Sequence, residues 1–261
     1  MAHQPEFKPS DTIAEFGKSI RHKFMENPEP FYMGAGVVVL IIIAAVIGLM
    51  QLQNTREDFR QDKDEAIILY HRALTSSQSE DVSQYIKNLQ YARETINNFI
   101  SKYPARKQTV FMRLYSTMLE YELAVAQGNN ADIQHAQESF RQFVEKYPNH
   151  ILTPRAAFNI GQTYEQLGNM RAARSNYQYV QEQYTDSSLI AEAGFNIGVT
   201  YEAEMNYHAA MLSYKKVIDN YDDSPWKIEA QKRLALLTYR YGNIPEPVVK
   251  SAAGTIQTRI Q

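Results

Sequence analysis

The side chains best able to do chemistry in this sequence are six histidines, a set of carboxylates and eighteen tyrosines. Histidines and carboxylates could hold a metal ion or exchange protons, but no histidines have the H-E-x-x-H spacing that places two ligands on one helix face. Asp222 and Asp223 are adjacent carboxylates between two helical patterns, where a solvated turn or a helix cap is expected. There is no cysteine, which excludes thiolate nucleophiles and thiolate metal sites. The sequence therefore predicts no catalytic residue, no metal, no cofactor and no small-molecule substrate.

Four tyrosines, Tyr164, Tyr177, Tyr201 and Tyr214, could instead stack on the bases of a nucleic acid. Nucleic-acid binding also needs a basic surface, and the chain has 27 Lys and Arg against 29 Asp and Glu, a net charge of -2. The tyrosines recur at a fixed period and at helical spacing, which favours packing between helices. We therefore expect no nucleic-acid partner.

The tyrosines belong to an internal repeat, in which one block aligns with the next at an offset of 37 residues. Gly161 recurs as Gly198, and the residues that match in the same register are Ala156/Ala193, Phe158/Phe195, Asn159/Asn196, Tyr164/Tyr201, Glu165/Glu202, Ala173/Ala210 and Tyr177/Tyr214. A glycine in the middle of a helix costs about 1 kcal/mol relative to alanine. Its recurrence predicts that another helix passes too close for a side chain. The Gly168-Asn169 pair predicts the turn between the two helices of a repeat, and Gly242-Asn243 predicts the same turn later.

This pattern resembles the tetratricopeptide repeat, a helical hairpin that stacks into a superhelix. The fold class expected is all-α: an α-solenoid of tetratricopeptide-like hairpins that follows a single N-terminal transmembrane helix. The solenoid is expected over residues 53–261, with its clearest repeats at 154–188 and 191–225, degenerate repeats at 62–104 and 105–148, and a final helix at 225–242. Beyond Pro245 and Pro247 the chain forms either a short capping helix or a loose end.

The transmembrane helix is expected at residues 31–52, because no polar side chain occurs from Met33 to Met50. About 20 apolar residues make a helix of roughly 30 Å, the thickness of the hydrocarbon core. A cleaved signal peptide is the alternative, but the run is long for one and follows 30 residues of tail. The tail, residues 1–30, is basic near the span, which favours a cytoplasmic N-terminus. Ile13, Phe16, Ile20 and Phe24 have helical spacing in it, so the tail is either an amphipathic helix on the membrane or a flexible basic flank.

Tetratricopeptide geometry implies a concave groove lined by the first helix of each repeat. The groove residues it implies here are Arg155, Phe158, Asn159, Gln162, Glu165, Phe195, Asn196, Glu202, Lys232 and Arg233. Two readings of the phenylalanines remain open: they are apolar anchors for a bound peptide, or they pack inside the superhelix.

The order of tail, span and repeat domain resembles the YfgM-type ancillary translocon subunits of bacterial inner membranes. That resemblance implies a single-pass inner-membrane protein with its repeats in the periplasm. It also implies an adaptor for protein partners: subunits of a membrane complex such as the secretion channel, a periplasmic chaperone, or client peptides. The alternative is a structural scaffold subunit of a large envelope assembly, such as a flagellar collar or a secretion machine.

Overall fold

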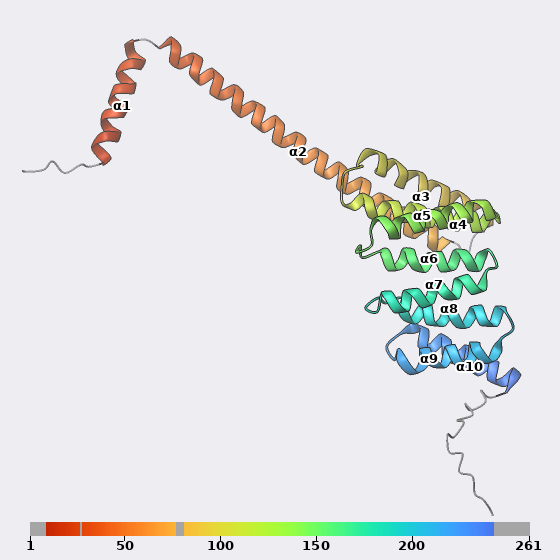
Figure 1. Cartoon of the computed structure of the whole chain (residues 1–261). Coiled ribbons are helices and arrows are strands. Elements are labelled where there is room, and N and C mark those ends of the chain that lie inside the picture. The colour runs from red at the N-terminus through yellow and green to blue at the C-terminus, as the bar shows by residue number, and fades with distance from the viewer. Residues whose placement is uncertain (1–8, 27, 77–80, 243–261) are drawn as a thin grey trace, which may run out of the picture. The chain divides into compact units, whose positions relative to one another are not determined.

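The computed structural model describes residues 9–26, 28–76 and 81–242, and each regular element in those ranges is an α-helix. The chain divides into two compact units, Met1–Lys63 and Asp64–Gln261. The helices are α1 Pro9–Glu26, α2 Glu29–Thr75, α3 Val82–Lys102, α4 Gln108–Gln127, α5 Asn130–Lys146, α6 Thr153–Gln166, α7 Met170–Gln183, α8 Ile190–Ala203, α9 Tyr207–Asn220 and α10 Pro225–Tyr241 (Figure 1). The all-α solenoid expected from the sequence is confirmed.

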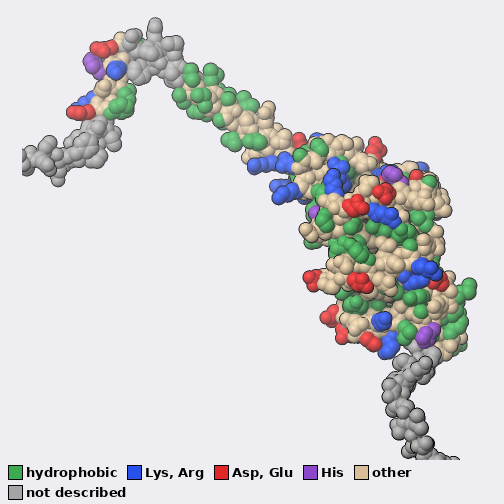
Figure 2. Space-filling model, viewed as in Figure 1, with side chains coloured by type: hydrophobic (Ala, Val, Ile, Leu, Met, Phe, Trp, Pro, Cys, Tyr) green, Lys and Arg blue, Asp and Glu red, His purple; other side chains and the backbone are tan. Residues whose placement is uncertain are grey.

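The first unit consists of α1 and the N-terminal part of α2. The described part of α2 from Val37 onward contains a stretch long and apolar enough to cross a membrane, judged by length and composition. None of that stretch is buried: Val37, Leu40 and Leu52, for example, are 56 %, 66 % and 56 % exposed. Figure 2 shows hydrophobic side chains over the visible face of this part of α2. The helix therefore presents apolar surface that no other described part of the chain covers.

The expected span at 31–52 and the beginning of the repeat expected at 62–104 are parts of one continuous helix, α2. The segment from Gln53 to Lys63 contains no glycine or proline. Neither helix-breaking residue interrupts the backbone hydrogen bonds there, so the helix continues across the boundary between the two units.

The second unit is a stack of helical hairpins in which each helix from α3 to α10 packs against the next in sequence (Figure 1). In the hairpins α4/α5, α6/α7 and α8/α9, we call the first helix A and the second helix B. The degenerate repeat expected at 62–104 covers the end of α2 and α3, the one expected at 105–148 covers α4 and α5, and α10 is the last described A helix. Residues 243–261, where a capping helix was one expectation, lie outside the described residues.

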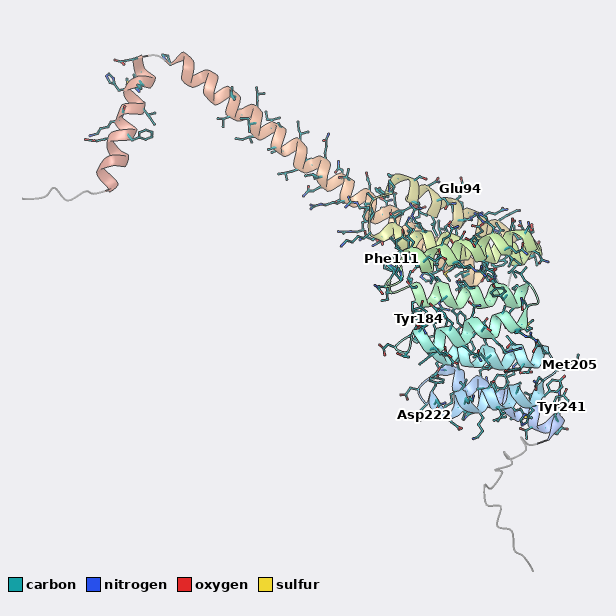
Figure 3. The ribbon with its side chains drawn as sticks, in the orientation of Figure 1. Glu94, Phe111, Tyr184, Met205, Asp222 and Tyr241 are labelled. Atoms are coloured by element: carbon teal, nitrogen blue, oxygen red, sulfur yellow. The ribbon has the colours of Figure 1, made fainter. Side chains whose placement is uncertain are left out.

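The turn between helices A and B follows one chemical rule in each hairpin. Gly128 and Gly168 adopt positive φ angles of 65° and 76°, the left-handed conformation that ends a helix. The next residue, Asn129 or Asn169, caps the following helix by accepting backbone N–H groups on its side-chain oxygen. In the third hairpin Met205, with φ of 59°, takes the place of the glycine. Figure 3 labels Met205 and Tyr241 at this edge of the solenoid, and Tyr184 and Asp222 at the opposite edge, where one repeat joins the next.

The mid-helix glycines confirm the close packing expected from the sequence. A Cβ atom on Gly161 would lie 2.5 Å from the Tyr177 ring, and one on Gly198 would lie 2.4 Å from the Tyr214 ring. Both tyrosines are fully buried. Because helix A has no side chain at this position, a tyrosine from helix B of the same hairpin packs directly against its backbone.

Candidate protein-binding surface

The surface that sequence reasoning singled out is carried by the A helices α6, α8 and α10. Direct contacts join α4 to α6 and α8 to α10, so successive A helices lie side by side. We refer to the row of polar residues on α6, α8 and α10 as the A-helix face. It consists of Arg155, Gln162, Glu165, Glu192, Asn196, Glu202, Glu229, Lys232 and Arg233.

Ion pairs connect the A helices across this face. The Arg155 guanidinium lies 3.7 Å from the Glu192 carboxylate, which joins α6 to α8. The Arg233 guanidinium lies 3.6 Å from the Glu202 carboxylate, which joins α8 to α10. These distances leave the charges loosely paired, and Arg155 and Arg233 are 37 % and 42 % exposed. Because exposed pairs of this kind contribute at most about 1 kcal/mol, the arginines can exchange these partners for groups on another protein at little cost.

Tyrosine hydroxyls from the B helices fix two of the carboxylates. The Tyr177 hydroxyl donates a hydrogen bond to Glu165, and the Tyr214 hydroxyl donates one to Glu202. Glu165 and Glu202 therefore have a structural role as hydrogen-bond acceptors. The repeat alignment includes both halves of this bond, because Glu165 matches Glu202 and Tyr177 matches Tyr214. These bonds hold the carboxylates in place rather than leaving them mobile.

Burial makes parts of this face unfavourable for negative charge. Removal from water raises the pKa of Glu165 above its ordinary value, although the Tyr177 hydrogen bond partly offsets the effect. Burial likewise raises the pKa of Glu192, which the nearby Arg155 partly offsets, and that of Glu122 on the preceding A helix α4, outside the A-helix face. Among the described residues, Glu122 and Glu165 each accept a tyrosine hydroxyl and form no ion pair. A cationic group from a partner would stabilise these carboxylates.

The two phenylalanines are not on this surface. Phe158 is 0 % exposed and Phe195 is 5 % exposed. The Phe158 ring packs against Tyr177 at a centroid distance of 5.1 Å, and the Phe195 ring packs against Tyr214 and Trp226 at 5.2 and 5.0 Å. The expectation that they anchor a bound peptide is wrong, because the core encloses both rings: side chains of α7 and α8 surround Phe158, and side chains of α9 and α10 surround Phe195. Of the two readings left open by the sequence, packing inside the superhelix is the one observed.

The remaining expected residues differ in how accessible they are. Asn159 is buried, at 3 % exposure. Gln162 and Asn196 are half-buried, and Lys232 is exposed with its ammonium 3.2 Å from Glu229. The structure thus brings Arg155, Gln162, Glu165, Asn196, Glu202, Lys232 and Arg233 to an accessible face, and leaves Phe158, Asn159 and Phe195 inside.

Sequence reasoning missed two exposed apolar residues on the outer side of α10, Ile228 and Tyr239. Ile228, Leu236 and Tyr239 share one side of this helix and are 59 %, 42 % and 90 % exposed. Their spacing in the sequence indicates this arrangement, because residues eight and three positions apart lie on the same side of a helix. Among the residues that the structure describes, α10 is the last helix of the stack, so no helix B covers this side.

No grouping that could support metal chemistry occurs in the described ranges, where no three His, Asp or Glu side chains are placed to hold an ion. Charges of both signs are interspersed over the visible face of the second unit (Figure 2).

Comparison with known families agrees with this geometry. Tetratricopeptide-repeat family models match residues 119–150, 154–182 and 192–224, which extend from α4 to the end of α9. The chain therefore carries tetratricopeptide repeats, the class of helical hairpin that commonly mediates protein–protein interaction.

Comparison with solved structures adds two likenesses at low identity. A tetratricopeptide repeat protein from Parabacteroides merdae is 17 % identical over 69 % of this chain and 62 % of that one, with a TM-score of 0.45. A kinesin light chain with nearly identical TPR-like repeats from Podosopora anserina is 14 % identical over 70 % of this chain and 86 % of that one, with a TM-score of 0.49. This chain thus matches less than two thirds of the Parabacteroides protein. The comparison with curated proteins gave no match.

Proposed function

We propose that this protein is a membrane-anchored tetratricopeptide adaptor that binds other proteins at the bacterial inner membrane. The observation that carries the proposal is the combination, in one chain, of a repeat solenoid and an apolar helix that no other described part of the chain covers. The partners proposed are subunits of a membrane complex such as the secretion channel, a periplasmic chaperone, or client peptides.

The membrane anchor is supported by the exposure of α2. From Val37 to Leu52 its large apolar side chains are between 47 % and 66 % exposed. A continuous apolar surface of this kind is unfavourable in water, because each Å² of apolar area left in water costs about 25 cal/mol. In a bilayer the same side chains face acyl chains, and the helix satisfies its own backbone hydrogen bonds.

The proposed topology places the N-terminus in the cytoplasm and the solenoid in the periplasm. Lys18, Arg21 and Lys23 precede the span, and Arg56, Arg60 and Lys63 follow it, so the charge bias is small. The absence of cysteine makes a direct test simple. A single cysteine at Ser19 should react with a membrane-impermeant maleimide only after the inner membrane is opened. One at Asn149, in an exposed junction of the solenoid, should react in intact spheroplasts.

The binding surface proposed is the A-helix face, with Arg155, Arg233 and Lys232 as cations and Glu165 as a fixed carboxylate. Its weak ion pairs can be replaced by a partner's charged groups, and its hydrogen-bonded tyrosines keep it preorganised. Anchoring concentrates this face at the membrane, which strengthens weak contacts with other membrane-bound proteins.

Photo-crosslinking in native membranes tests the adaptor directly. A photoreactive amino acid would replace Gln162, which is half-buried on the A-helix face, in one variant. It would replace the exposed Gln178 on helix B of the same hairpin in the matched control. We expect Gln162 to capture membrane-complex subunits, a chaperone or clients, and Gln178 to capture much less. Equal or stronger capture at Gln178 would contradict binding by the A-helix face.

The alternative function is a scaffold subunit of a large envelope assembly. The observation that favours it is the apolar side of α10, where Ile228, Leu236 and Tyr239 are exposed. A permanent interface would cover such a side. A photoreactive residue at Ile228 that captures one structural protein in constant proportion, together with loss of assembly on Ile228→Ser, would favour the scaffold over the adaptor.

A further inference from the structure

An uncovered apolar stripe runs along α1, the helix that precedes the proposed membrane anchor. Phe16 and Ile20 are 67 % and 42 % exposed and are four residues apart, so they lie on one side of the helix. The register continues this line to positions 13 and 24, an isoleucine and a phenylalanine. At about 100° per residue the four positions fall within an arc of roughly 80°. The stripe is too narrow for a buried core helix and suits a flat apolar boundary.

The charged residues of α1 are sorted around this stripe. Arg21 lies on one flank and Lys23 on the other, each within about 100° of its centre by helical geometry. Glu15, His22, Glu26 and the basic Lys18 lie on the opposite side, where the His22 ring nitrogen is 3.5 Å from the Glu26 carboxylate. Basic side chains beside an apolar stripe can reach phosphate groups while their stems stay among apolar atoms. Acidic side chains on the far side remain in water.

The chain keeps α1 close to the start of α2. The helices end and begin at Glu26 and Glu29, so only two residues separate them. Three Cα–Cα steps span at most about 11 Å. When α2 spans the bilayer, the C-terminal end of α1 is therefore held near the membrane surface. At that distance even a short apolar stripe encounters lipid at high local concentration.

We propose that α1 is an interfacial helix that lies along the bilayer surface, with the Phe16–Ile20 stripe at the boundary of the acyl chains. Arg21 and Lys23 then face the phosphates of anionic lipids, and the Glu15 side of the helix faces water. This proposal rests on the proposed anchoring of the protein by α2. It gives the tail a function of its own, as a second membrane contact that distinguishes anionic from neutral lipid.

The test uses spin labels on the full-length protein in vesicles. Because the chain has no cysteine, single cysteines can be introduced directly at Gly17, Glu15 and Ile42. Gly17 borders the stripe, and a side chain added there meets no atom within 4 Å, so the label keeps Phe16 and Ile20 intact. Glu15 marks the opposite side of α1, and Ile42 marks the proposed span. Collision of each label with oxygen and with a water-soluble nickel complex reports its depth, in vesicles with and without one-third phosphatidylglycerol.

We expect the Ile42 label to lie deep, the Gly17 label at the headgroup boundary and the Glu15 label in water. The oxygen-to-nickel accessibility ratio should then be several-fold higher at Gly17 than at Glu15 in anionic vesicles. Reversing both flanking charges, Arg21→Glu with Lys23→Glu, should bring the Gly17 ratio down to that of Glu15. Lys18→Glu is the matched control, because Lys18 lies on the polar side and its reversal should leave the ratio unchanged.

The possible failures are distinguishable. A deep Ile42 label with equal ratios at Gly17 and Glu15 would overturn the interfacial helix and leave the anchor intact. An Ile42 label in water would overturn the anchor and the interfacial helix together. Protection of Gly17 that persists in detergent and rises with protein concentration would indicate a second copy of the chain on the stripe, which would also overturn the proposal.

Discussion

A methyl group added at Gly198 tests the helix packing most directly. In the structure a Cβ atom at this position would lie 2.4 Å from one carbon of the Tyr214 ring and 2.8 Å from two others. The ring cannot move aside easily, because Tyr214 is fully buried, its hydroxyl is bonded to Glu202 and its face packs on Phe195. Gly198→Ala must therefore displace a pinned side chain or push two helices apart.

The expected loss follows from two opposing contributions. Overpacking a close-packed core costs about 1–3 kcal/mol, and the pinned ring places this case near the upper limit. Replacing glycine by alanine in a helix returns about 1 kcal/mol. We therefore expect Gly198→Ala to lower the free energy of unfolding by about 2 kcal/mol. At roughly 2–4 °C per kcal/mol for a domain of this size, the melting temperature should fall by about 4–8 °C.

Thermal melting of the full chain in detergent, followed by circular dichroism, measures this change. The decisive comparison is with Tyr214→Ala, which removes the ring: in that background Gly198→Ala should raise the melting temperature, since only the gain in helix propensity remains. Gly194→Ala in the same helix should cost less than Gly198→Ala, because its Cβ would lie 2.8 Å from the Gln181 amide nitrogen and 3.0 Å from a Val217 methyl group rather than against a ring. An unchanged or higher melting temperature for Gly198→Ala alone would refute the packing of Tyr214 against this glycine.

Three further outcomes are expected from the same melting assay. Met205→Gly should stabilise the protein by about 1 kcal/mol, because Met205 has a left-handed φ of 59° that an L side chain disfavours. An unchanged melting temperature would contradict backbone strain at Met205. Asn169→Ala should cost about 1 kcal/mol, because its side chain caps α7 by accepting the Ala172 N–H; a neutral result would show that the cap is dispensable. Burial raises the pKa of Glu122 and Glu165 above the ordinary 4.5, so their contribution to stability is full at lower pH and is lost as pH rises through the folded-state pKa. Replacing both glutamates with glutamine should therefore stabilise the protein more at pH 7.5 than at pH 4.5. An equal change in melting temperature at the two pH values would contradict the raised pKa values of the two glutamates.

The repeats could be predicted because their packing uses residues of unusual size at fixed positions. A glycine such as Gly161 in the middle of a helix is costly, so its return as Gly198 identifies a close approach and fixes the repeat length. The turn glycines are equally informative, since few other residues adopt a left-handed backbone. The sequence divides α2 into a span and a separate solenoid helix, because the composition changes from apolar to charged after residue 52. That change marks where the surroundings change, but no helix stop signal accompanies it, so the helix itself continues.

The accessible surface could be predicted only in part. Helical spacing gives the direction in which a side chain points from its own helix. It does not show whether neighbouring helices bury the side chain in that direction. Phe158 and Phe195 point from A helices that contact helices on several sides, and both are enclosed. The polar residues Arg155 and Arg233 remain accessible because their long side chains extend past the neighbouring backbone.

The hairpin α4/α5 shows why a repeat can lack the mid-helix glycine and still pack in the same way. Counting back seven residues from the turn residue gives Gly161 in α6 and Gly198 in α8, but Tyr121 in α4. On helix B the residue opposite is a tyrosine in the later hairpins and Gln137 in α5. Tyr121 is buried and packs near Phe140, and Gln137 is buried with its amide nitrogen 2.7 Å from the Thr163 hydroxyl of α6. The large aromatic side chain has thus moved from helix B to helix A, so the space between the helices stays filled. A search for identical residues cannot recognise this exchange, because what the hairpins share is the volume of a pair of residues and not the identity of either one.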